Sequence, residues 1–403
     1  MTSFGAFVHD RLSRGRLTVD AGVRYDFEAL PAGIPEDADD LSPRLGVGFA
    51  LDPRTMLRAS VGRYHDRSVL AALERPLRED GRRAFEQVID APEAARVLRA
   101  TGGGALGERW SGVPPSRFAV APSLPAPSSD QASVSLERLV AHDLTATVSY
   151  LFSRGRDQQR TRNVNLQRAG GGFTPIDPAW SDVFRLEATA RSTYHGVSLV
   201  LNRRFAQDMA WTVAYTVSRV RDDASDFDEQ PNDPTDLRAE RSWSRYHQAH
   251  RLSLNGLFDF FEAEEARPGE GGRRGRPPLL RQLFGQWELA PVVTVGSGRP
   301  VNPLLGVDAN RTHAHPPAAR PEGLARNSLR TPGTVNVDAR LTKYVAVGRR
   351  GKLDLVVDVF NLLNRTNVIA VNSYLPRVAA RDRSRPILFA PRREVQLSID
   401  FEF

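Results

Sequence analysis

The residues best suited to chemistry are four acids in the segment RDDASDFDEQPNDPTD, residues 221–236. Carboxylate oxygen atoms at such short spacing are typical ligands of Ca²⁺. The candidate ligands are Asp222, Asp223, Asp226 and Asp228. The segment lacks the register of an EF-hand, because no Glu closes a twelve-residue loop after a central Gly. A solvated acidic loop without metal is the alternative interpretation, and the spacing favours it.

Two histidine pairs are the other candidates for metal binding. His247 and His250 are three residues apart, which places their side chains on opposite faces of a strand. His313 and His315 have the better spacing, but they lie in a proline-rich segment without a third ligand nearby. We therefore expect neither pair to bind a metal, and we expect no cofactor.

No motif for covalent chemistry is found in the sequence. The chain contains no cysteine and no G-x-x-x-x-G-K-[ST], G-x-S-x-G or H-E-x-x-H pattern. Its glycine runs, residues 102–104, 170–172 and 271–276, are interpreted as flexible loops. The sequence therefore predicts a protein that is not an enzyme.

Composition also limits the class of protein. Apolar residues are 40% of the 403 residues, which is little for a soluble protein with a large core. No apolar run approaches the ~20 residues of a membrane helix. The net charge is +7, but the arginines are scattered among acids along the whole chain, so we expect no nucleic-acid binding. The first ten residues, MTSFGAFVHD, do not resemble a signal peptide.

Strands are the elements that must position these side chains, because apolar and other residues alternate along much of the chain. One apolar face consists of Leu144, Ala146, Val148, Tyr150 and Phe152. Clear strands are predicted over 17–27, 144–152, 211–217, 252–260, 335–341, 353–359 and 395–403, and weaker ones near 2–12, 43–51, 54–64, 131–140, 195–205 and 286–295. Many of these strands approach the ~9–11 residues that cross a bilayer when tilted.

Short and long connections alternate between the predicted strands. The long ones are residues 65–130, 154–193, 220–246, 297–332 and 364–390, and the exception is an insert at 262–281 where a short turn is expected. This alternation predicts an all-β, antiparallel up-and-down transmembrane barrel with long extracellular loops. Within the longest loop, SVLAALERPL and EAARVLRA predict a small amount of helix. That helix either binds a partner or packs within its loop.

Nine segments resemble the barrel strands of TonB-dependent outer-membrane receptors. They are AGVRYD (21–26), LSPRLGVGFAL (41–51), TMLRASVGRYHDR (55–67), YHGVSLVLNRRF (194–205), VAYTVSRVRDD (213–223), GSGRPVN (296–302), RPEGLARNS (320–328), VDARLTKY (337–344) and LDLVVDVFNLLNRTNV (353–368). Their order is similar to the C-terminal barrel half of the Oar-like branch, whose members carry a carboxypeptidase-regulatory-like domain.

The resemblance implies that residues 1–403 are the C-terminal part of such a barrel. About thirteen of about 22 strands would be present, so the barrel would be incomplete. The family's signal peptide, TonB box and plug are not recognised in the chain. An odd number of strands also predicts an open sheet. We therefore expect a C-terminal fragment, or a split or mis-started gene.

The chain ends in the strand VQLSIDFEF, whose odd positions are all apolar. The resemblance implies that this strand carries a signal for the barrel-assembly machinery. The signal residues would be Val395, Leu397, Ile399, Phe401 and the terminal Phe403. The other partners implied are outer-membrane lipid, the TonB complex acting through the missing plug, and an unidentified extracellular ligand.

The function implied is a receptor and transporter in the outer membrane that takes up a bulky ligand. Two alternatives from other classes stay open. One is a barrel without a plug that binds a partner at the cell surface, as an adhesin does. The other is a soluble all-β binding domain, which would form a stable monomer without detergent.

Overall fold

The computed structural model describes residues 2–89, 94–96, 98–99, 113–206, 208–260, 285–314, 317–347, 351–375 and 384–402. The predicted insert at 262–281, the glycine runs at 102–104 and 271–276, His315 and Phe403 lie outside the described residues. In the described part of the chain, no helix is long and apolar enough to span a membrane.

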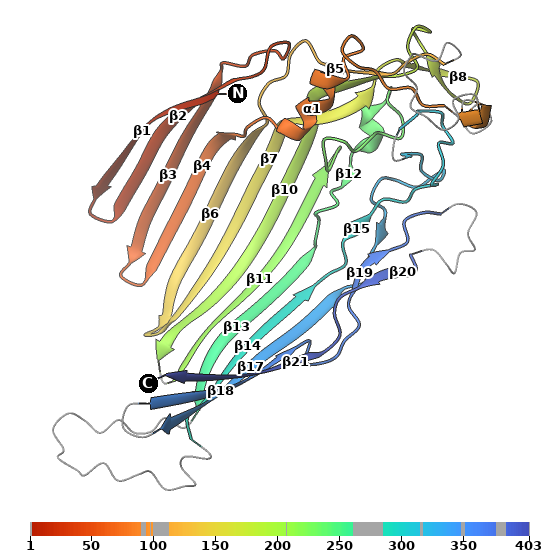
Figure 1. Ribbon diagram of the computed structural model, residues 1–403. Coiled ribbons are helices and arrows are strands. Elements are labelled where there is room, and N and C mark those ends of the chain that lie inside the picture. Colours follow the sequence, from red (N-terminus) through yellow and green to blue (C-terminus); the bar gives the residue numbers. More distant parts are fainter. Residues whose placement is uncertain are drawn as a thin grey trace, which may run out of the picture.

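One antiparallel sheet contains most of the strands, and thirteen of them follow one another in chain order across it. They are β1 (Thr2–Arg14), β2 (Leu17–Ala29), β3 (Asp40–Asp52), β4 (Thr55–His65), β6 (Ser128–Ala141), β7 (Leu144–Asn163), β10 (Val183–Ala206), β11 (Met209–Asp222), β13 (His250–Phe260), β14 (Trp287–Gly296), β17 (Thr334–Val347), β18 (Gly351–Phe360) and β21 (Glu394–Glu402). The predicted all-β, up-and-down architecture is confirmed. The sheet is curved and open (Figure 1), and its edge strands β1 and β21 do not pair within the described residues.

Tight turns join β1 to β2, β3 to β4, β6 to β7 and β10 to β11 at one end of the sheet, which we call the turn end. Two of the turns use a left-handed backbone, with φ of 58° at Gly15 and 61° at Asp208. Glycine adopts this conformation freely, and aspartate tolerates it better than most residues. Turns of two or three residues force neighbouring strands to pair, so chain order becomes strand order.

The long connections lie at the opposite end of the sheet, which we call the loop end, and they carry the remaining elements (Figure 1). These are α1 (Leu70–Arg78), β5 (Arg117–Val120), β8 (Leu166–Ala169), β9 (Gly172–Pro175), η1 (Leu237–Glu240), β12 (Ser242–Trp243), β15 (Pro300–Val301), β16 (Leu329–Arg330), β19 (Val368–Val371) and β20 (Pro386–Phe389). Helix α1 confirms the prediction from SVLAALERPL. Residues 94–96 and 98–99 of the second predicted stretch are also helical.

Two strands extend well beyond their predicted ends. β7 has 20 residues and β10 has 24, so the connection between them is shorter than the predicted loop at 154–193. Their extra residues pair with each other, and β5 adds to β10 in parallel. Gln159 and Arg160 are buried there, because the loop-end structures cover both faces. Apolar alternation ends where both faces are covered by protein, so the pattern did not reveal these extensions.

The two faces of the sheet differ along its whole width. On one, the apolar face, Val134, Tyr150, Val197 and Val217 lie side by side across β6, β7, β10 and β11. On the other, the polar face, Ser149 and Ser198 are neighbours, with their hydroxyl oxygen atoms 3.0 Å apart. The strand registers therefore join the alternating residues into one continuous apolar surface and one continuous polar surface.

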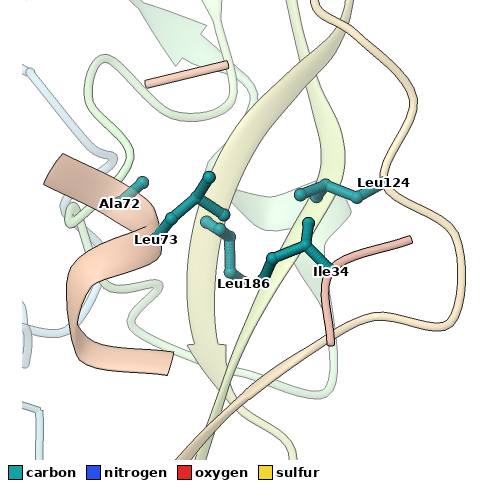
Figure 2. Close-up of a cluster of buried hydrophobic side chains, with 5 residues drawn as sticks. All are labelled: Ile34, Ala72, Leu73, Leu124 and Leu186. Atoms are coloured by element: carbon teal, nitrogen blue, oxygen red, sulfur yellow. The ribbon is translucent and has the colours of Figure 1, made fainter. Parts of the chain in front are cut away.

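A small apolar core holds the loop end together (Figure 2). It consists of Ile34 after β2, Ala72 and Leu73 of α1, Leu124 before β6 and Leu186 of β10. Leu186 is fully buried and Leu73 is 1% exposed. Because these residues come from two long connections and one strand, their burial fixes the loops against the sheet.

Candidate ligand-binding site

A groove of about 560 Å³ opens at the loop end of the polar face. Residues of β17, β18 and β21 line it, together with residues of β19 and of the segments after β14 and before β21. Its lining includes Thr334, Asn336 and Asp338 of β17, together with Phe360 and Glu394. We call it the loop-end groove.

Asp338 organises the centre of the loop-end groove. One carboxylate oxygen accepts a hydrogen bond from the backbone N–H of Asn361 at 2.7 Å, and the other accepts one from the Asn336 side chain at 2.7 Å. Asn361 has a left-handed backbone with φ of 49°, and its side chain donates to the carbonyl oxygens of Arg365 and Pro391. This small set of contacts fixes the strand end to the loop above it.

The lining of the groove is suited to binding a polar ligand. Arg299 and Arg392 supply exposed cationic groups, and Ser297, Thr331 and Gln248 add neutral hydrogen-bonding groups. Phe360, Val368 and Ile369 provide an apolar part. A concave surface with apolar walls and a few oriented polar groups is typical of ligand-binding sites. Nothing in this set of residues resembles a catalytic constellation.

A network of buried charges joins two of the long loops beside the groove. Arg326 is 1% exposed and donates to Asp222, to Glu229 and to the carbonyl oxygen of Glu240. Arg320 makes a bidentate pair with Glu240, at 2.6 and 2.9 Å. Although burial opposes its charge, the carboxylates of Glu229 and Asp222 raise the pKa of Arg326. The network ties the 223–249 connection to residues 320–326.

The four acidic candidates for Ca²⁺ do not form one cluster of ligands. Asp222 pairs with Arg326 and Asp223 with Arg160, while Asp226 pairs with Arg245. Three of the four carboxylates thus already have cationic partners. Calcium binding at Asp222, Asp223, Asp226 and Asp228 stays an untested prediction, and the ion pairs give these acids a structural role instead.

Acids do converge at another place, in the connection between β2 and β3. Asp37, Asp39 and Asp40 each offer a carboxylate oxygen within 4.8 Å of the others. Asp37 also accepts a hydrogen bond from the backbone of Ala126 at 2.6 Å, and its proximity raises the pKa of Asp39. The hydrogen bond between Asp37 and Ala126 ties the connection between β2 and β3 to the segment before β6.

The histidines have separate structural surroundings. His247 is buried and stacks on Trp243 with ring centroids 4.4 Å apart. Burial, followed by the positive charges of Arg330 and Arg219, lowers the pKa of His247 to about 4. His250 instead lies on the apolar face, where its Nδ1 is 2.9 Å from the Tyr215 hydroxyl.

Of the other pair, only His313 is described, with its Nδ1 3.0 Å from Asp182. His247 and His250 contact different side chains, Trp243 and Tyr215, and His315 lies outside the described residues. The prediction that these histidines are not metal ligands stays untested.

The loop-end groove was not predicted from the sequence. Its loop residues come from three separate connections, and most of its polar residues, taken alone, are ordinary Ser, Thr, Asn or Arg residues. The one available signal was the segment NLLNRTN, residues 361–367. Its asparagines favour left-handed turns and backbone contacts, and Asn361 and Asn364 both have positive φ.

The fold and its two faces define an outer-membrane β-barrel protein. Residues 29–325 match a family model described as an outer membrane beta barrel domain. The match covers more than half of the chain, so the chain belongs to this family, and its location is the outer membrane.

Individual relatives agree with this assignment. The chain is 26% identical over 430 residues to the TonB-dependent transporter Oar of Myxococcus xanthus, covering 92% of this chain and 36% of that protein. The structure resembles the outer membrane transporter YddB of Escherichia coli with a TM-score of 0.59 at 12% identity, over 98% of this chain and 44% of the other. It resembles the ferric enterobactin receptor PfeA of Pseudomonas aeruginosa with a TM-score of 0.57 at 14% identity, again over 98% and 44%.

The predicted resemblance to TonB-dependent outer-membrane receptors, including the Oar-like branch, is thereby confirmed. The chain spans less than half the length of these relatives.

Proposed function

We propose that the chain forms part of the wall and of the ligand-binding surface of a transporter that takes up a bulky ligand across the outer membrane. The observation that carries the proposal is the loop-end groove, which opens on the polar face of a barrel-type wall. The relationship to the TonB-dependent transporter Oar supports a transport role. The similar fold of a ferric enterobactin receptor supports a ligand larger than a simple ion.

In this proposal the apolar face lies against lipid and the polar face lines the lumen. The loop end then faces the cell exterior, so the loop-end groove meets the ligand first. TonB would deliver energy through a plug domain. Because the described residues form wall and loops, the plug would have to come from outside them.

The proposal also assigns a role to the last strand. β21 would present Val395, Leu397, Ile399 and Phe401 to lipid, and with Phe403 it would carry the signal for the barrel-assembly machinery. Phe403→Ala in the whole protein should then lower the amount that reaches the heat-modifiable, membrane-inserted form.

Uptake by living cells tests the transport function. Host cells are compared with cells lacking this gene and with cells lacking tonB, and mass spectrometry measures which compounds each strain removes from rich medium. We expect a set of compounds that is removed only when both genes are present. Removal that is independent of TonB, or a change in cell adhesion alone, would contradict the proposal and favour an adhesin.

Variants of the loop-end groove connect uptake to the site. Arg299→Ser combined with Arg392→Ser removes both cationic side chains of the groove, and we expect uptake to fall severalfold. Arg67→Ser combined with Arg393→Ser is the matched control, because it removes two exposed loop-end arginines outside the groove. Equal uptake by the two double variants would exclude the loop-end groove as the ligand site.

A further inference from the structure

The apolar face changes character abruptly near the loop end. Across β7, β10 and β11, Tyr150 lies beside Val197, which lies beside Val217. Two residues further toward the loop end, the same three strands present Phe152, His195 and Arg219. After two more residues they present Arg154, Thr193 and Arg221, and Arg221 pairs with Trp243 of β12. A row with two aromatic rings, Phe152 and His195, is therefore followed directly by a row with two arginines, Arg154 and Arg221, on the same face.

A pocket of about 590 Å³ lies at this boundary. Four arginines line it: Arg154 of β7, Arg191 of β10, Arg238 of η1 and Arg241 beside β12. All four are exposed. Phe152, which belongs to the apolar face, also lines the pocket. We call it the arginine pocket.

Two acids near the arginine pocket are already paired with other arginines. Asp223 is the one acid in the lining, and it pairs with the buried Arg160 at 3.0 Å. Asp130, the strand neighbour of Arg154, pairs with Arg63 at 2.8 Å and with Arg156 at 2.7 Å. The pocket consequently has a large excess of positive charge.

In the described residues, no carboxylate forms an ion pair with any of the four pocket arginines. Arg241 donates to the carbonyl oxygen of Arg191 at 2.9 Å and to the Thr193 hydroxyl at 2.7 Å. In the part of the chain that the structure describes, none of the four guanidinium groups forms an ion pair. Arginines held near one another without acids are a typical receptor for phosphate, because each guanidinium can donate two parallel hydrogen bonds to it.

A second group of cations continues this surface sideways. Arg219, Arg221 and Arg330 each lie over the Trp243 ring, with guanidinium carbons 5.0–5.4 Å from its centroid. Trp243 thus gathers three more positive charges, those of Arg219, Arg221 and Arg330. The cationic region is wider than the pocket itself.

We propose that the arginine pocket binds the phosphorylated headgroup of a lipid in the outer leaflet of the membrane. The proposal rests on the assignment of the apolar face to lipid. The lipid's phosphate occupies the space between Arg154, Arg191, Arg238 and Arg241, and its acyl chains run along Phe152 and Tyr150. A soluble anion would satisfy the arginines equally well, but it would leave the aromatic side of the pocket unused. The position on the outer surface of the wall, rather than on the polar face, separates this site from the transport path.

Lipid binding to the detergent-solubilised whole chain tests the proposal. Native mass spectrometry measures the bound fraction as phosphatidic acid, phosphatidylcholine with the same acyl chains, or inorganic phosphate is added. We expect one tightly bound phosphatidic acid, at least about tenfold stronger binding than phosphatidylcholine, and no displacement by millimolar phosphate. If inorganic phosphate displaces phosphatidic acid completely, or if both lipids bind equally, the lipid assignment is overturned.

A double variant connects the binding to the pocket. Arg154→Ser with Arg238→Ser removes two guanidinium groups that make no ion pair in the described residues, so folding should be unaffected; heat-modifiable mobility on gels checks this. We expect phosphatidic acid binding to weaken about tenfold or more. The control is Arg67→Ser with Arg393→Ser, which should bind as the unchanged chain does. Equal binding by the two double variants would overturn the proposal.

Discussion

Arg326 shows how much of the loop end depends on single charged residues. It is buried among Asp222, Glu229 and Glu240, so its removal would take the counter-charge from Asp222 and Glu229, while Glu240 keeps its pair with Arg320. Breaking a buried ion pair by deleting one partner typically costs ~3–5 kcal/mol. We therefore expect Arg326→Met to open the 223–249 connection locally while the sheet stays folded. Hydrogen exchange, read at peptides of this connection, measures the change.

The control for this prediction is Arg67→Met, which removes an exposed arginine elsewhere at the loop end. Its exchange pattern should match that of the unchanged chain. If the Arg326 variant also keeps full protection in residues 223–249, the buried network does not hold the loops.

His247 gives the loop end a dependence on pH. Its pKa is lowered to about 4, mainly by burial, whereas an unfolded histidine has a pKa of ~6.5. Between these values the unfolded state binds more protons, so stability falls as the pH falls from about 6.5 toward 4 and is level above that range. The melting temperature, followed by tryptophan fluorescence, should drop by several degrees over this interval.

His247→Gln is the matched variant for the pH experiment. Its side-chain carbonyl can still accept from the Val220 backbone, as the Nδ1 of His247 does at 3.3 Å, but it does not titrate. The fall in melting temperature between pH 6.5 and 4 should become smaller in this variant. An identical drop would assign the pH dependence to the carboxylates instead.

At the residue scale, sequence reasoning found the acids but not their partners. Asp222 and Arg326 are 104 residues apart, and Asp223 and Arg160 are 63 apart. Only the strand order brings them together, so spacing along the chain could not distinguish a Ca²⁺ loop from an ion-pair network. The same reason hid the arginine pocket, whose four arginines belong to β7, β10 and the connection after β11.

At the element scale, apolar alternation predicted all thirteen strands of the chain-order path, because each has one apolar face. It failed beyond Arg154 and Ser192, where β7 and β10 continue among loop-end structures and the alternation ends. Apolar alternation therefore reports contact with an apolar medium rather than strand conformation itself. The strand extensions follow from tertiary pairing, which a local pattern does not contain.

β21 allows a direct test of the two faces. Leu397 lies on the apolar face opposite Val357, and Ser398 lies on the polar face opposite Val356. An arginine at the lipid-facing midplane costs ~2–4 kcal/mol, whereas a lumen position tolerates it. We expect Leu397→Arg to lower the heat-modifiable folded fraction of the whole protein strongly, and Ser398→Arg to leave it nearly unchanged. Equal losses, or the reverse order, would show that the faces are assigned wrongly.

At the scale of the whole molecule, the open sheet has a consequence for association. The odd number of strands predicted that the sheet would not close, and the structure has β1 and β21 as separate edges. Both edges carry exposed apolar side chains; Val8 is 73% exposed and Leu397 75%. Unpaired backbone groups are costly in hydrocarbon, by several kcal/mol each, and edge strands pair with other strands when these are available.

We therefore expect the 403-residue chain, expressed by itself and folded in dodecyl maltoside, to associate through its edges. Light scattering after size-exclusion chromatography should give a protein mass of two or more chains. Phe7→Lys with Ser398→Lys places a charge on the polar face of each edge strand, which disfavours edge pairing, and should shift the mass toward single chains. A single-chain mass for the unchanged protein, with heat-modifiable mobility, would contradict this expectation. It would mean that β1 and β21 of one chain pair with each other. The open sheet would then be a closed one in solution.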